Sequence, residues 1–436
     1  MKDGCTHVEM RHHDLWLAAD PSRVVLRPFT IISEPRGTAY GVITRAERIA
    51  RAVMEMSDSE VREQLERVDA DFFGRHWQTH AIFIDRYKQM RHLIGDLRDV
   101  DDQSATLIGA YFSHEYSYAA AAIMNPSIVP HPDQTGCNNG SVKFVMSLRT
   151  VGEGHISSIA FREGVASDSG HFSLWPEPQF AIAATPDPHS GLGGPVTVRR
   201  HGSAPLSGNV IFPITPAQAN GLEDLRLVRF TEEDGSQPYY GTYTAYSGRE
   251  VSCEMMTTNN FSSFDLTPMR GAAAKHKGLA LFPRRVNGKY AAIGRLDSES
   301  LFYLESDNRF DWNNGRMIMA PQYPWELVQL GNCGSPIELD EGWLLLTHGV
   351  GAMRQYAIGA ALLDRRDPSK VLVRSDKPFL APINETREGY VPNVVYTCGG
   401  MKVGDSILIP TASSRLQVRQ APPLVQEARR PRCQRR

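Results

Sequence analysis

Acidic and cationic side chains in the middle of the chain have the types and spacing for acid catalysis beside an anion. The segment Gly221-Leu222-Glu223-Asp224-Leu225-Arg226 carries two adjacent carboxylates in what we expect to be a short turn. Spaced along the chain around it are five cationic residues, Arg149, Arg270, Lys277, Arg295 and His348. One carboxylate among several cations suits an enzyme that protonates a leaving group while it holds an anion, whereas a hydrolase more usually needs a second carboxylate to activate water. Solvated surface charges give the same pattern, so the spacing alone leaves both interpretations open.

The composition narrows the class of protein. The chain has 436 residues and a formal net charge of -2, which leaves room for two or three domains or one large β architecture and does not indicate binding to nucleic acid. Its six cysteines lack zinc-binding spacing, so no metal site is predicted. The start of the chain is charged, and no stretch approaches about 18 apolar residues. We therefore expect a cytoplasmic protein without a membrane span.

The first 124 residues have a helical pattern. Thr44 with Glu47, and Ser57 with Glu60, fit the capping box that begins a helix. Apolar residues then recur at helical spacing after the second box. Further helices are expected over about 79–97 and from about 103 to the alanines at 119–122. This block packs on the main domain, or serves as a lid or an arm for homo-oligomer formation; the sequence leaves these interpretations open.

From residue 125 onward, short β-type runs replace the helices. Turn signals such as Asn287-Gly288 and Glu341-Gly342 separate many of them, as in antiparallel hairpins. Strands this numerous without intervening helices indicate a sandwich, a barrel or a propeller, and no repeat period chooses among these. The expected strands are Val142–Leu148, Ile156–Phe161, Arg226–Phe230, Tyr239–Tyr246, Leu279–Phe282, Tyr290–Arg295, Gly342–His348 and Val391–Thr397.

A series of motifs in this β region resembles glycoside hydrolase family 130, the β-mannoside phosphorylases and related mannosidases. The series includes Asn125-Pro126-Ser127, Ser147-Leu148-Arg149, Gly221-Leu222-Glu223-Asp224, Lys277-Gly278-Leu279-Ala280-Leu281-Phe282-Pro283, Gly334-Ser335-Pro336-Ile337 and Gly389-Tyr390-Val391-Pro392-Asn393-Val394-Val395. The resemblance implies a mainly β fold: a five-bladed β-propeller over 125–413 with an N-terminal helical extension over 1–124. Five blades at about 50 to 60 residues each agree with this length.

The resemblance also assigns roles to individual residues. Asp224 falls at the family's catalytic acid, whose proton is thought to pass through the mannose 3-hydroxyl, and we expect Glu223 to help raise its pKa. Leu225 stands where the family usually has proline. The implied phosphate-binding residues are Arg149, Arg270 and Lys277, with Arg295 and His348 as additions; the implied substrate-binding residues are Asn125, Ser127 and Glu223. Tyr243 is a further candidate, because an aromatic face suits the apolar face of a sugar, although in a propeller such aromatic residues more often pack between blades.

The implied activity is an inverting phosphorylase that transfers a terminal β-linked mannosyl residue to inorganic phosphate and yields α-mannose 1-phosphate. Phosphate is the co-substrate, a β-mannoside oligosaccharide is the other partner, and no cofactor is implied. Two alternatives remain open: a β-mannosidase on the same fold, and a non-catalytic sugar-binding propeller.

The end of the chain departs from the family after Pro410. Thr411-Ala412-Ser413-Ser414-Arg415 replaces an expected motif that contains an aspartate, and residues 414–436 form an atypical arginine-rich tail. An altered or frame-shifted terminus explains this, and predicts a final blade without its closing strand.

Overall fold

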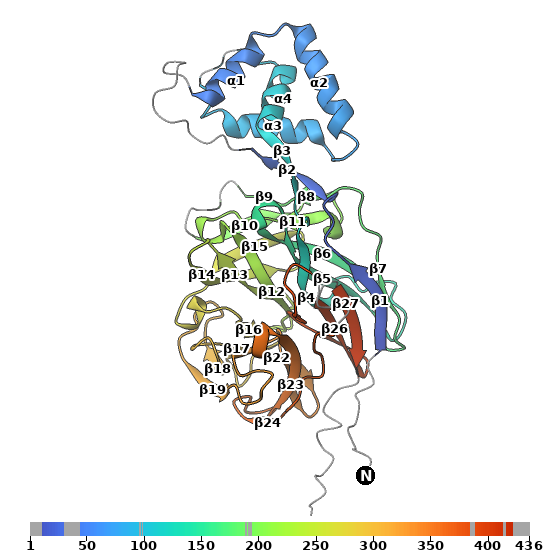
Figure 1. The fold of residues 1–436 in the computed structure, drawn as a ribbon, viewed down its shortest axis with the longest axis vertical. Helices are drawn as coiled ribbons and strands as arrows, with labels where there is room; N and C mark the ends of the chain where they lie inside the picture. Colours follow the sequence, from blue (N-terminus) through green and yellow to red (C-terminus); the bar gives the residue numbers. More distant parts are fainter. Residues whose placement is uncertain are drawn as a thin grey trace, which may run out of the picture. The chain divides into compact units, whose positions relative to one another are not determined.

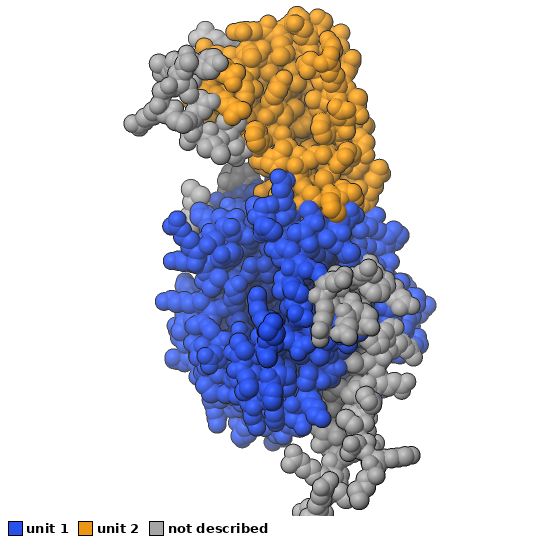
Figure 2. All heavy atoms as spheres, in the orientation of Figure 1, with its two compact units in different colours: residues 1–20, 119–177, 184–436 blue, residues 21–118, 178–183 orange. Residues whose placement is uncertain are grey.

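The computed structural model describes residues 11–29, 44–95, 97, 99–187, 190, 194–383, 389–412 and 416–421. The chain divides into two compact units (Figure 2). Unit 1 comprises Met1–Asp20, Ala119–Glu177 and Ala184–Arg436, and unit 2 comprises Pro21–Tyr118 and Pro178–Ala183. The boundaries of these units differ from the expected domain boundaries at residues 124 and 413. The first strand, Arg11–Leu17, belongs to unit 1, and the later segment Pro178–Ala183 belongs to unit 2.

Unit 2 contains the predicted helices. The Ser57 side chain accepts a hydrogen bond from Glu60 N and the Glu60 side chain bonds Ser57 N, so the second capping box is present. In the first predicted capping box, the Thr44 hydroxyl oxygen accepts a hydrogen bond from Glu47 N. No helix in the described ranges is long and apolar enough to cross a membrane. The elements are α1 Arg45–Met54, α2 Asp58–Phe72, α3 Thr79–Met90, α4 Asp102–Tyr111, β2 Val24–Pro28, β3 Ser113–Ser117 and β8 Ile182–Ala183.

The expectation of a helix from about 103 to 122 is wrong in its second half. Helix α4 ends at Tyr111, and Ser113–Ser117 pairs antiparallel with β2, which takes up the backbone hydrogen-bonding groups that a longer helix would use. The predicted strand over Val391–Thr397 is also wrong. Pro392 lacks an N–H and Asn393 has a left-handed φ of 61°, so the segment makes only isolated bridges.

Unit 1 is built of antiparallel strands that fall into five groups within the described residues (Figure 1). Group 1 is β4 Ala122–Pro130, β5 Ser141–Val151, β6 Ser157–Ser167, β7 Phe172–Leu174 and β11 Asn209–Ile211. Group 2 is β12 Gly221–Arg229, β13 Tyr239–Tyr246, β14 Val251–Thr258, β15 Ser263–Pro268, β10 Val196–Arg199 and β9 Thr185–Pro186. Group 3 is β16 Ala280–Leu281, β17 Tyr290–Gly294, β18 Leu301–Ser306 and β19 Gly315–Met319. Group 4 is β20 Gln329–Asn332, β21 Ile337–Leu339, β22 Gly342–Val350, β23 Tyr356–Leu363 and β24 Val371–Arg374. Group 5 is β25 Met401–Val403, β26 Ser406–Ala412, β27 Leu416–Ala421 and β1 Arg11–Leu17. A single parallel pair, Gly221 with Ser157, joins groups 1 and 2 in one sheet.

The apolar cores of unit 1 lie between consecutive groups. Each of five clusters contains buried residues from two groups, and the last cluster joins group 5 to group 1. Representative members in that order are Phe161 with Phe264, Met255 with Ala292, Ile293 with Leu345, Leu346 with Ile409, and Leu408 with Phe144. Each group is therefore packed on both faces.

The expectation that no strand follows Pro410 is wrong. Strand β26 continues to Ala412, and β27 pairs antiparallel with it from Leu416 to Ala421. On its other edge β27 pairs with β1 near the start of the chain (Figure 1). Backbone pairing on both edges needs no particular side chains, which is why the unfamiliar sequence still forms the strand. Residues 422–436 lie outside the described residues.

Candidate active site

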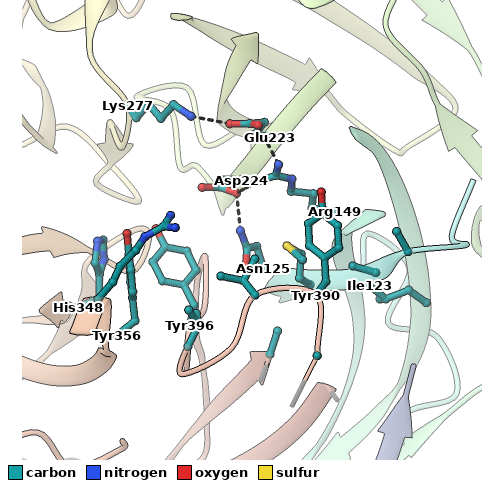
Figure 3. A pocket seen from close by; sticks show the side chains of 18 of the residues that line it. Ile123, Asn125, Arg149, Glu223, Asp224, Lys277, His348, Tyr356, Tyr390 and Tyr396 are labelled. Carbon is teal, nitrogen blue, oxygen red and sulfur yellow. Dashed lines mark hydrogen bonds and ion pairs between the residues drawn. The ribbon is translucent and has the colours of Figure 1, made fainter. Parts of the chain in front are cut away.

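One cavity of unit 1, of about 450 Å³, gathers most of the residues that the sequence singled out (Figure 3). All five strand groups contribute to its wall, in a strand or next to one. The predicted residues that line it are Asn125, Arg149, Glu223, Asp224, Lys277, Arg295 and His348. Because these residues are spread over more than 200 positions of the sequence, only the tertiary fold brings them together.

A β-bulge in β12 aims both carboxylates into the cavity. The segment is not a turn: Glu223 pairs with Thr244 and Arg226 with Thr242, so Asp224 and Leu225 face a single residue of β13. Asp224 has a φ of 56°, a left-handed conformation that aspartate tolerates better than most residues. In a regular strand, neighbouring side chains point to opposite faces. The bulge removes that alternation, and Glu223 and Asp224 line the same cavity.

A second bulge supplies the partner of Asp224. Strand β4 shifts register against β5 between Met124 and Ser127, and Asn125 lies in this shift with a φ of 50°. Its Nδ2 donates to Asp224 Oδ1 at 2.5 Å (Figure 3). Two irregular positions in different strand groups thus hold each other, which is consistent with the tendency of backbone strain to gather at functional sites.

Two of the predicted cations are ion-paired to these carboxylates. Arg149 places Nη1 3.2 Å from Asp224 Oδ1 and Nη2 2.8 Å from Glu223 Oε1, and its Nε donates to Ser157 Oγ at 2.9 Å. Lys277 Nζ lies 2.7 Å from the other Glu223 oxygen (Figure 3). Glu223 therefore bridges Arg149 and Lys277. Asp224 Oδ2 has no hydrogen-bond partner among the described residues, which leaves it as the oxygen able to carry a proton to a substrate.

The pKa of Asp224 is shifted in the direction opposite to our expectation. Burial raises it, but the charges of Arg149, Arg226 and Lys277 and the hydrogen bond from Asn125 outweigh burial and lower the pKa of Asp224 to about 2. The expectation of a raised pKa for Asp224 is therefore wrong when only the groups of the protein act on it. The neighbouring carboxylate is offset by its own two cations, so its repulsion does not dominate.

Two arginines in the inner wall of the cavity, Arg226 and Arg295, have no carboxylate partner within the described residues. Arg226 is 4% exposed; it donates to the carbonyl oxygen of Asp224 at 2.8 Å and to the Tyr396 hydroxyl at 2.7 Å, and its Nε is unpaired in this part of the chain. Arg295 makes one described hydrogen bond, from Nε to the carbonyl oxygen of Lys277 at 3.2 Å. Buried charges are normally paired, so an anion in the cavity would supply what these guanidinium groups lack.

His348 lies beside these arginines as a neutral side chain. Its Nδ1 donates to the carbonyl oxygen of Asn332 at 3.1 Å, and the ring stacks against Tyr356 and meets Tyr396 edge to face. Burial, then Arg295 and Arg226, lower the pKa of His348 to about 3. It lines the cavity, but it cannot act as a cation at neutral pH.

Three predicted site residues do not line this cavity. Arg270 is exposed and paired with Asp311 through two hydrogen bonds of 2.7 and 3.0 Å. Ser127 is fully buried, and its Oγ accepts from Leu227 N, so it joins β4 to β12. Tyr243 is buried in the core between groups 1 and 2, with its hydroxyl on Glu254. Each side chain already has structural partners.

Other cavity residues were missed. They are chiefly Arg226, Arg354, Tyr356, Tyr390 and Tyr396. Arg226 ends the same acidic segment, so its position was visible in the sequence, but its burial was not. Tyr390 stands in the quoted Gly389-Tyr390-Val391 motif. The other residues carry no local signal, because only the packing of group 4 against the neighbouring segments turns them toward the cavity.

The chain is similar to known proteins in sequence and in fold. Residues 206–414 match the family described as beta-1,4-mannooligosaccharide phosphorylase. The chain is similar to a 1,2-beta-oligomannan phosphorylase of Thermoanaerobacter sp. (strain X514), with 33% identity over 202 residues, which are 45% of this chain and 65% of that protein. It is 35% identical over 195 residues to a beta-1,2-mannobiose phosphorylase of the same organism, covering 44% and 62%. The matches thus span less than two thirds of these relatives.

Solved structures share the fold. A putative glycoside hydrolase from Bacteroides ovatus superimposes with a TM-score of 0.52 at 18% identity, over 71% of this chain and 89% of that one. At this identity the likeness concerns the fold alone. With the family match and the curated relatives, the resemblance noted in the sequence is confirmed: residues 206–414 are similar to glycoside hydrolase family 130.

Proposed function

We propose that the protein is an inverting phosphorylase that transfers a terminal β-linked mannosyl residue to inorganic phosphate and releases α-mannose 1-phosphate. The observation that carries this proposal is the charge balance of the cavity. In the inner part of the cavity four cations, Arg149, Arg226, Lys277 and Arg295, face two carboxylates, and the guanidinium groups of Arg226 and Arg295 have no acidic partner in the described chain. A fifth cation, Arg354, is exposed at the rim of the cavity. The excess of two positive charges in the inner part matches one phosphate dianion.

In this proposal Asp224 is the general acid. A phosphate oxygen attacks the anomeric carbon from the face opposite the leaving group, the bond from that carbon to the glycosidic oxygen breaks, and the proton of Asp224 passes to the leaving oxygen. The family resemblance routes that proton through the mannose 3-hydroxyl. Asp224 must therefore be protonated when both substrates are bound. A phosphate dianion near Arg295 and Arg226 offsets the cations that lower the pKa of Asp224, so phosphate binding itself favours the protonated acid.

The hydrolase alternative needs a free second carboxylate to activate water. Glu223 is the nearest candidate, but Arg149 and Lys277 bind both of its oxygens at 2.8 and 2.7 Å. These contacts favour a role for Glu223 in holding cations rather than in abstracting a proton from water. Arg295 and Arg226 would also have no function in water activation, which supports phosphate as the nucleophile.

We also propose that the five strand groups are the blades of a five-bladed β-propeller, with β1 and β27 together completing the last blade. The cyclic order of the five apolar cores supports this, since the cluster between groups 5 and 1 returns to the start. So does the convergence of residues from every group on one cavity. A ring of blades is the arrangement in which each group packs on two neighbours while one edge of each reaches a common axis.

Product analysis with and without phosphate tests the function. The protein is incubated at pH 7 with β-1,2-mannobiose, and separately with β-1,4-mannobiose. Each incubation contains either about 10 mM phosphate, which exceeds a KM of up to about 1 mM, or chloride in place of phosphate. Mannose 1-phosphate formed only with phosphate is the expected result, and the preferred disaccharide reports the linkage. Free mannose released at equal rates in both buffers would contradict phosphorolysis and support the hydrolase.

A further inference from the structure

Two hairpins of unit 1 have the same unusual backbone. One connects β5 to β6 through Gly152–Ile156, and the other connects β22 to β23 through Gly351–Gln355. The first glycine has φ and ψ of -103° and -160° in one and -102° and -163° in the other, and the last residue has -76° and 126° or -75° and 122°. A bond from the first N–H to the last carbonyl oxygen closes each, at 3.1 and 2.9 Å. Inside each hairpin lie two consecutive residues with left-handed φ. These are Gly154 and His155 in one hairpin, and Met353 and Arg354 in the other.

Three of these four left-handed positions carry side chains. Their φ values are 60° for His155, 56° for Met353 and 54° for Arg354, a region that glycine occupies without strain. Gly154 shows that this turn accepts glycine. Retaining a long side chain at such a position is unfavourable for the backbone, and such residues gather at binding sites. This backbone strain suggests that the side chains of His155 and Arg354 have a role in binding.

Both hairpins place a polar side chain against a tyrosine of the cavity. His155 Nδ1 lies 3.1 Å from the Tyr390 hydroxyl, and Tyr390 lines the cavity with 43% of its surface exposed. Arg354 also lines the cavity, with its guanidinium 6.0 Å from the centre of the Tyr356 ring. Figure 3 shows Tyr356 and Tyr390 on opposite sides of Asn125 and Asp224.

The exposure of these groups separates them from the anion-binding part of the cavity. Arg226 is 4% exposed, whereas Arg354 in the cavity wall is exposed, as is His155, which reaches the cavity through its contact with Tyr390. Arg354 has no carboxylate partner within the described chain. A sugar presents an apolar ring face together with a border of hydroxyl groups, so an aromatic face next to a strong hydrogen-bond donor is a suitable site for it.

We propose that the His155–Tyr390 and Arg354–Tyr356 pairs form the two walls of the subsite for the leaving-group sugar, which is the acceptor in the reverse reaction. This assignment rests on the proposed phosphorylase function. It makes His155 and Arg354 residues that determine specificity for the leaving group, because each holds a donor and an aromatic ring in place from a fixed hairpin. The sugar transferred to phosphate lies further in, beside Asp224.

Glycine variants test the proposal without adding backbone strain. Arg354→Gly and His155→Gly each remove one side chain and relieve a left-handed position, so both are expected to fold. Met353→Gly is the matched control, because it relieves the same strain in the same hairpin while its side chain, 90% exposed, does not line the cavity. Two measurements are made on each: the KM for the acceptor sugar in synthesis from mannose 1-phosphate, and calorimetric binding of β-1,2-mannobiose.

Arg354→Gly is expected to raise the acceptor KM by about tenfold and His155→Gly by about three- to tenfold, with a smaller change in the KM for mannose 1-phosphate. Mannobiose affinity should fall by similar factors, and Met353→Gly should resemble the wild type in both. Equal effects in all three variants, or an unchanged acceptor KM and mannobiose affinity in Arg354→Gly and His155→Gly, would overturn the proposal. If the wild type binds mannobiose through these residues but forms no mannose 1-phosphate, the phosphorylase function fails while the sugar subsite stands.

Discussion

Replacing Asp224 by asparagine removes a charge and a proton donor while keeping the shape of the side chain. The amide oxygen of Asp224→Asn can still accept from Asn125 and Arg149. The pKa of Asp224 falls from 3.8 to about 2 because its cationic neighbours outweigh its burial. The difference of about 1.8 units (3.8 minus 2) corresponds to about 2 kcal/mol of unfolding free energy at neutral pH.

The sign of this contribution follows from the direction of the shift. A carboxylate whose folded pKa is depressed stabilises the fold above its unfolded pKa, near 3.8, and loses that effect as the pH falls toward 2. Asp224→Asn should therefore be less stable than the wild type by about 2 kcal/mol at pH 7, and the difference should shrink between pH 4 and pH 3. Urea denaturation in phosphate-free buffer measures this. Asp307→Asn, the same change at a side chain that is 87% exposed, is the control.

The kinetic effect is expected to be much larger and to depend on the leaving group. Loss of a general acid lowers turnover by about 100- to 10,000-fold. We expect that loss for Asp224→Asn with β-1,2-mannobiose, whose leaving alcohol needs a proton. With 2,4-dinitrophenyl β-mannoside, whose leaving group is stable as an anion, we expect a loss below about tenfold. Equal losses on both substrates would assign Asp224 a structural role, and wild-type rates on mannobiose would place the acid elsewhere.

Two further predictions concern the surroundings of the acid. Lys277→Ala should raise the KM for phosphate about tenfold, with little change in the KM for the sugar. This is the low end of the effect expected for losing a charge-assisted hydrogen bond, because the Lys277 side chain is 41% exposed. Equal changes in both KM values would refute an anion-binding role for Lys277. Tyr396→Phe should lower the unfolding free energy by about 1 to 3 kcal/mol in urea denaturation, because it leaves a buried donor of Arg226 without its acceptor. Tyr246→Phe, whose hydroxyl bonds a carbonyl oxygen in a surface turn, is the control, and an equal loss there would contradict this reason.

Local sequence determined the elements whose signals are local. The capping residues Thr44 and Ser57 begin helices because a side chain two or three positions away from an unpaired N–H can bond it in any context. The β character of the region after residue 125 followed from its turn signals and strand composition. The motif around Asp224 carried the resemblance to the family and the prediction of the acid, since residues adjacent in sequence stay adjacent in the fold.

Tertiary structure decided what depends on distant partners. Whether Asp224 and Glu223 share a face depended on a bulge fixed by pairing with β13, and whether Arg270 reached the site depended on Asp311, 41 residues away. The closing strand β27 forms against β1, from the opposite end of the chain. The pKa of Asp224 is a sum over charges from several strand groups, which no local pattern contains. The sequence alone thus predicted the chemistry that we propose for Asp224, while the packing of distant strands determined which cations face this carboxylate and in which protonation state it rests.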